Sequence, residues 1–127
     1  MKYYRIAAHL LAAFAMTTAP LLAQATTLVC SGKVEMLGYH QPGTLYVKLS
    51  GMNAPVAICN MDTSWAPAGS ASGTTSVSSC KTLFSALMFA KQAGTNITSM
   101  WFDADTLPAS CTTFPSWSQV NLRYFDF

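Results

Sequence analysis

The segment SSCKTLFSALMFAKQAG, residues 78–94, decides the fold, because it has the apolar period of a helix and separates two groups of strand-like segments. Its apolar residues recur at spacings of three and four, which places them on one stripe of a helix. They are Leu83, Phe84, Leu87, Met88 and Ala90. Ser78 and Ser79 offer hydroxyls that can cap a first turn, and Gly94 stands where a left-handed residue ends a helix. The pattern predicts a helix over residues 80–93.

Three segments before this helix alternate between apolar and polar residues, which is the pattern of strands with one buried face. They cover residues 26–39, 44–50 and 55–61. In the first two, the residues predicted to face inward are Cys30, Gly32, Val34 and Met36, then Leu45, Val47 and Leu49, while Tyr46 and Lys48 face outward. A turn at 41–43 and a short connection at 51–54 join the segments into a predicted antiparallel meander.

Two further strands are predicted after the helix, at residues 95–102 and 117–125. The element order β-β-β-α-β-β is that of the OB fold, a five-stranded Greek-key barrel with a helix between the third and fourth strands. The predicted fold class is therefore α+β and mainly β, with an OB-like barrel; an α+β sandwich with the same order is the alternative. The segment 62–79 is rich in Ser, Gly, Ala and Thr and predicts a long surface loop, either functional or mobile.

Residues 1–25 have the layout of a secretory signal peptide. Lys2 and Arg5 precede an almost wholly apolar stretch, and the segment 23–25, AQA, supplies small residues for cleavage. A transmembrane anchor is the alternative, but an apolar stretch of about 17 residues is at the lower limit for spanning a bilayer. We expect a single domain over 26–127 that is periplasmic or secreted, with no transmembrane segment after cleavage.

The composition excludes several classes of protein. Charged residues make up 9% of the chain and aromatic residues 12%, which is unlike the composition of disordered chains. The formal net charge of +2 falls to zero once residues 1–25 are removed, since five basic and five acidic residues remain. This balance argues against a nucleic-acid partner.

The domain contains four cysteines: Cys30, Cys59, Cys80 and Cys111. In a short exported domain without a Cys-x-x-Cys pair, they predict two disulfides rather than a zinc or redox site. Three pairings are possible. Pairing Cys59 with Cys80 would close the loop before the helix, and Cys30 in the first strand could then reach Cys111 ahead of the last strand.

Several segments together resemble small exported four-Cys proteins of Gram-negative bacteria. They are CSGKV at 30–34, LYV at 45–47, VAICN at 56–60, CKTLFSALM at 80–88 and the late Cys111. Such proteins are similar in element order to the OB-fold receptor-binding subunits of pentameric bacterial AB-type toxins. The resemblance implies an exported binding protein that forms a homo-oligomer, but no sugar-contact motif matches, so it assigns no functional residue.

The residues provide no convincing catalytic or metal-binding constellation. His40 is alone in a turn, and Asp103 with Asp105 is more typical of loop capping than of a catalytic pair. The methionines could suggest a copper site, but Met36 and Met88 fall on predicted core faces, where Met is a common gap-filler. We therefore expect neither an enzyme nor a cofactor or metal ion.

Aromatic residues near strand ends and in loops are the candidate ligand contacts. They are Trp65, Tyr39, His40 and Trp117. Aromatic rings suit sugar faces and the centres of protein interfaces. The first hypothesis is therefore an exported, non-catalytic glycan- or receptor-binding subunit. A periplasmic inhibitor or immunity protein for an exported enzyme or toxin is the alternative, and Trp65 could instead fold back into the core.

Overall fold

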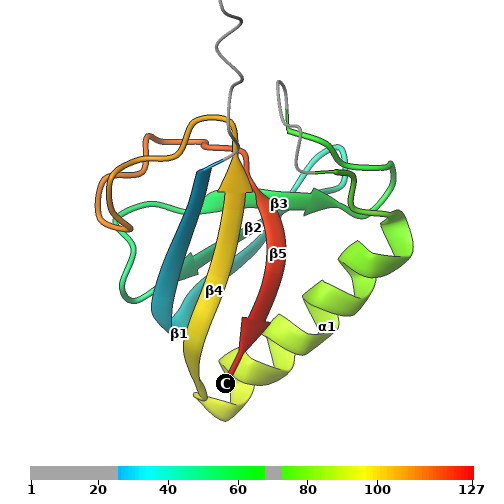
Figure 1. Ribbon diagram of the computed structural model, residues 1–127. Helices are drawn as coiled ribbons and strands as arrows, with labels where there is room; N and C mark the ends of the chain where they lie inside the picture. Colours follow the sequence, from blue (N-terminus) through cyan, green and yellow to red (C-terminus); the bar gives the residue numbers. More distant parts are fainter. Residues whose placement is uncertain (1–25, 68–72) are drawn as a thin grey trace, which may run out of the picture.

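The computed structural model describes residues 26–67 and 73–127 (Figure 1). The predicted signal peptide at 1–25 and the 68–72 portion of the predicted surface loop lie outside these residues. The described chain is mainly β, with one antiparallel sheet of five strands and one helix between the third and fourth. The elements are β1 (Thr26–His40), β2 (Thr44–Leu49), β3 (Val56–Asn60), α1 (Val77–Ala93), β4 (Asn96–Ala104) and β5 (Asn121–Asp126). The predicted element order is confirmed.

The strand β1 lies at the centre of the sheet, whose order is β3-β2-β1-β4-β5. Its first half pairs with β4 and its second half pairs with β2, in both cases antiparallel. The change of partner coincides with two irregularities, one between Cys30 and Gly32 and one between Val34 and Met36. Gly32 has φ 129°, and a Cβ there would lie 2.9 Å from the backbone nitrogen of Gly51. Only glycine suits that position, because the conformation and the space both exclude a side chain.

The second irregularity corrects the predicted inward face of β1. Val34 is buried as expected, but Met36 is 42% exposed and pairs with Lys48, while Leu37 packs against the core. An extra residue in a strand reverses which side chains face inward beyond it, so the simple alternation fails from this point on.

The two ends of the sheet are joined where β3 meets the segment just before β5. Ala57 forms a parallel bridge with Gln119. The Ala57 N–H donates to the Ser118 carbonyl at 2.8 Å, and the Val120 N–H donates to the Ala57 carbonyl at 2.9 Å. The last strand therefore begins at Asn121 rather than at 117, because the residues before it bond to β3 instead of to β4.

The helix α1 lies along one side of the sheet and packs against β1 and β3 (Figure 1). It begins three residues before the predicted start, because the hydroxyl of Ser76 rather than that of Ser78 or Ser79 caps it, accepting from the Ser79 N–H at 3.1 Å. Gly94 ends it in the left-handed conformation, as predicted. Its buried residues are Cys80, Leu87 and Ala90.

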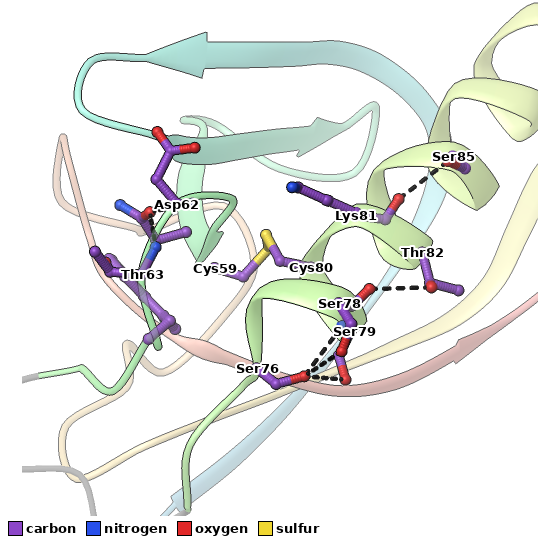
Figure 2. Close-up of a disulfide and its surroundings, with 12 residues drawn as sticks. Cys59, Asp62, Thr63, Ser76, Ser78, Ser79, Cys80, Lys81, Thr82 and Ser85 are labelled. Carbon is purple, nitrogen blue, oxygen red and sulfur yellow. Dashed lines mark hydrogen bonds between the residues drawn. A yellow bond between two sulfur atoms is a disulfide. The ribbon is translucent and has the colours of Figure 1, made fainter.

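Two disulfides connect elements that are distant in the chain. Cys30 pairs with Cys111 and Cys59 pairs with Cys80, with Cα–Cα distances of 5.8 and 5.6 Å, the pairing expected from the sequence. Figure 2 shows the second bridge joining β3 to the first turn of α1. Within residues 26–67 and 73–127, no helix combines the length and apolar character needed to cross a membrane.

Candidate functional site

A cavity of about 320 Å³ opens on the outer face of the β1–β2 hairpin, near its turn. Its lining comes from β1, β2 and two later segments, and most of it is aromatic or apolar. The lining residues are Met36, Gly38, Tyr39, His40, Tyr46, Pro55, Ser116 and Trp117. We refer to these eight residues as the aromatic pocket.

The pairing of β1 with β2 builds the floor of the aromatic pocket. Met36, Gly38 and His40 alternate along β1 and so project from one face of the strand. Gly38 is the strand partner of Tyr46. Because Gly38 has no side chain, the space beside the Tyr46 ring stays open. A Cβ at Gly38 would project toward the Met36 methyl group, 3.0 Å away.

Three aromatic rings in the pocket contact one another edge to face. The centroids of Tyr46 and Trp117 are 5.5 Å apart at 90°, and those of His40 and Trp117 are 5.7 Å apart at 68°. His40 and Tyr46 complete the set at 6.2 Å and 71°. Edge-to-face contacts are the preferred arrangement of aromatic pairs, so each ring helps to hold the other two in place.

Trp117 reaches the pocket through an unusual backbone conformation. Its φ is 66°, in the left-handed region, and its side chain is 65% exposed. A bulky residue in this region is uncommon and costs about 1–3 kcal/mol. The hydroxyl of Ser118 donates to the Pro115 carbonyl at 2.8 Å and closes a turn around Trp117. Strain of this kind is concentrated at functional sites, and here it places an exposed indole over His40 and Tyr46.

The loop that carries Trp117 is attached to the rest of the fold at several points. The Asn53 side chain accepts from the Phe114 N–H at 2.9 Å and donates to the Phe114 carbonyl at 3.0 Å. Phe114 is buried against Phe102, with ring centroids 5.9 Å apart. The disulfide of Cys111 with Cys30 joins the same loop to β1. These contacts within the fold therefore fix the loop that places Trp117 at the pocket.

The aromatic pocket has a largely uncharged lining. None of the described residues that line it is Asp, Glu, Lys or Arg. Polar groups come from His40, Ser116 and the two tyrosine hydroxyls, and the Tyr39 hydroxyl already accepts from the Gly43 N–H at 3.2 Å. In the described part of the chain, no group of three His, Cys, Asp or Glu side chains is placed to hold a metal ion.

The structure brings together three of the four residues that the sequence suggested as ligand contacts: Tyr39, His40 and Trp117. Trp65 lies elsewhere. Its side chain is buried, and its indole N–H donates to the Val120 carbonyl at 3.2 Å. Trp65 also pairs with Thr75 through two backbone hydrogen bonds. The interpretation of Trp65 as a ligand contact is corrected accordingly, because the ring folds back into the core.

Sequence reasoning missed the other residues of the pocket. They are Met36, Gly38, Tyr46, Pro55 and Ser116. Tyr46 was predicted to face outward, away from Leu45 and Val47, yet it is only 9% exposed, because the rings of His40 and Trp117 contact it. The sequence signal that could have indicated this part of the pocket is the pairing of Tyr46 with Gly38 across the predicted hairpin.

One further candidate from the sequence has a structural role. Asp103 is buried, and both of its carboxylate oxygens accept from the Arg123 guanidinium, at 2.7 and 3.0 Å. The Thr27 hydroxyl donates to the same carboxylate at 2.7 Å. This carboxylate therefore joins β1, β4 and β5 and lies outside the aromatic pocket.

We compared the chain with protein-family models, with curated proteins and with solved structures, and nothing matches it. The function is therefore inferred from the residues and the geometry of the aromatic pocket.

Proposed function

We propose that this protein is an exported, non-catalytic binding protein and that its ligand, a glycan, binds at the aromatic pocket. The observation that carries this proposal is the convergence of Tyr39, His40 and Trp117 on one cavity, where Tyr46 joins them. Small-molecule sites are concave and mostly apolar, with a few convergent polar groups. The aromatic pocket has this composition.

A sugar ring has features that complement the pocket. Its C–H groups form apolar faces that pack on aromatic rings, and Trp117 and Tyr39 are 65% and 55% exposed. Its hydroxyls need hydrogen-bond partners, which His40 and Ser116 can supply at the same cavity.

Two features of the whole chain support export and an OB-like fold. Two disulfides are typical of proteins in oxidising compartments, which supports a periplasmic or secreted location. The proposed OB-like Greek-key barrel is supported by the pairing of β1 with both β2 and β4 and by the Ala57–Gln119 bridge between the ends of the sheet. Loops at the ends of such strands commonly carry binding sites.

A glycan array tests the proposal. We expect the native protein to be retained by a defined set of glycans and the Trp117→Ala variant to lose that retention. Phe89→Ala is the matched control, because Phe89 is an equally exposed aromatic residue on α1 that does not line the pocket. Failure to bind any glycan, or equal loss in both variants, would contradict the proposed function.

A further inference from the structure

We infer that the group of the ligand that enters the aromatic pocket is a quaternary ammonium, such as the choline substituent of a glycan or the choline headgroup of a lipid. This inference rests on the proposed function, because it takes the aromatic pocket as the binding site. It goes further by naming the chemical group that the pocket recognises. The observation behind it is the arrangement of His40, Tyr46 and Trp117 as three nearly perpendicular walls.

Nearly perpendicular ring planes that line one cavity form a corner, in which a rounded group can contact the exposed rings of Trp117 and His40 beside the mostly buried Tyr46. The three interplanar angles are 68°, 71° and 90°, and all centroid separations are between 5.5 and 6.2 Å. The face of an aromatic ring carries negative partial charge and attracts a cation within about 6 Å of its centroid. Tryptophan gives the strongest attraction, and the Trp117 side chain is 65% exposed.

The remaining lining favours a cation that makes no hydrogen bonds. Met36, Gly38 and Pro55 present no strong donor or acceptor side chain. A primary ammonium would lose hydrogen bonds to water on entering, and beside Met36, Gly38 and Pro55 it would meet no strong side-chain acceptor to replace them. A quaternary ammonium has no N–H group, so its transfer into such a site costs less.

The charges around the pocket are also compatible with a cation. Lys48 is the strand partner of Met36, and its ammonium lies 2.6 Å from the carboxylate of Glu35, so this ion pair balances the charge of Lys48. The Lys91 ammonium, which donates to the carbonyls of Val34 and Glu35, is a second cation beside this strand. An acidic group would meet no Lys or Arg among the described lining residues, so its charge would be buried without a partner.

Calorimetric titration of the exported protein with choline and with 3,3-dimethyl-1-butanol tests the role of the charge. The alcohol is the neutral carbon analogue of choline and has nearly the same shape. We expect choline to bind about tenfold more tightly, because only the cation is attracted by the ring faces. An analogue that binds as tightly as choline, or the absence of choline binding, would overturn the inference.

Variants at Trp117 separate the aromatic face from simple apolar packing. Trp117→Phe keeps an aromatic face and should retain part of the choline affinity, whereas Trp117→Leu should lose about tenfold. Phe89→Leu is the matched control and should bind choline like the native protein. Unchanged binding by Trp117→Leu would overturn the inference, and circular dichroism shows whether each variant is folded. If Trp117→Leu does not fold, the comparison of choline with its neutral analogue in the native protein still tests the inference.

Two larger ligands distinguish the sources of the quaternary ammonium. One is a vesicle of phosphatidylcholine, with phosphatidylglycerol as the control lipid. The other is a phosphocholine-substituted polysaccharide, with its unsubstituted form as the control. If either ligand binds and free choline displaces it, the inference is supported and the source is identified. Binding to the phosphatidylcholine vesicle alone would in addition contradict a glycan as the ligand. Choline-free glycans that bind through Trp117 while choline does not would overturn the inference and leave the proposed function intact, whereas no binding at all removes both.

Discussion

At the scale of single residues, the aromatic pocket depends on a glycine that has no side chain and on a tryptophan whose backbone conformation is strained. Gly38 leaves open the space beside Tyr46, its partner across the hairpin. Trp117 adopts a left-handed backbone conformation that positions its ring over that space. A larger residue at 38 would fill the cavity, and a relaxed backbone at 117 would direct the indole elsewhere. Trp117 thus adopts a conformation that is unfavourable by itself, and Gly38 leaves space unfilled, and together they keep the cavity open.

The carboxylate of Asp126 gives a residue-scale prediction for the dependence of stability on pH. The hydroxyl of Ser99 donates to it at 2.7 Å and lowers the pKa of Asp126 below its ordinary value. The pKa of Asp126 is therefore lower in the folded protein than in the unfolded chain. The stability that this carboxylate contributes is fully present above its unfolded pKa and is lost as the pH falls through its folded pKa. We expect Asp126→Asn to flatten the fall of the thermal midpoint below about pH 4, measured by circular dichroism. If the thermal midpoints of the native protein and of the Asp126→Asn variant fell in parallel as the pH is lowered, this prediction would be wrong.

At the scale of elements, the loop between β4 and β5 carries Trp117 and is held by contacts to distant parts of the chain. Asn53, in the connection between β2 and β3, bonds to both backbone groups of Phe114. Its own N–H donates to the Cys111 carbonyl at 3.3 Å. The loop therefore has the fixed position that a preformed pocket needs, although it contains no regular secondary structure.

Asn53→Ala should lower the free energy of unfolding by about 1–3 kcal/mol, because the Phe114 N–H and carbonyl lose their partners. It should also weaken ligand binding at the aromatic pocket, although Asn53 does not line it. Urea denaturation measures the first effect and ligand titration the second. Asn53→Asp keeps the acceptor for the Phe114 N–H but places a second oxygen opposite the Phe114 carbonyl, so we expect it to destabilise the loop as well. Unchanged stability of Asn53→Ala would show that this side chain does not hold the loop.

At the scale of the whole molecule, disulfides and backbone hydrogen bonds join elements that the chain order separates. The bridge from Cys30 to Cys111 closes a sequence separation of 81 residues, and that from Cys59 to Cys80 closes 21. The Ala57–Gln119 bridge brings the two ends of the sheet together. A small domain with few charged residues thus obtains stability from covalent closure as well as from its core.

Removing the two disulfides separately should have unequal effects. Loop entropy predicts a loss of about 4.5 kcal/mol for the Cys30→Ser, Cys111→Ser pair and about 3 kcal/mol for the Cys59→Ser, Cys80→Ser pair. Chemical denaturation of the two double variants shows which of them loses more free energy of unfolding. The first pair should also weaken ligand binding, because Cys111 lies in the loop that carries Trp117. A larger loss of stability from the second pair would contradict the entropic account.

The sequence by itself determined the order of the elements, the helix with its glycine end and the two groups of strands. These features depend on local periodicity and capping, which neighbouring residues specify. It also suggested Tyr39, His40, Trp117 and Trp65 as candidate ligand contacts, because aromatic rings suit sugar faces and protein interfaces, and the first three line one cavity.

Only the tertiary structure decided which residues form the site. The irregularity after Val34 exposed Met36, which the uninterrupted alternation had placed in the core. Folding of the chain buried Trp65 and brought Trp117 to Tyr46 from a distant segment. The physical reason is that a strand pattern gives the faces of an ideal strand, whereas bulges and long-range packing depend on contacts between segments that the local sequence does not encode.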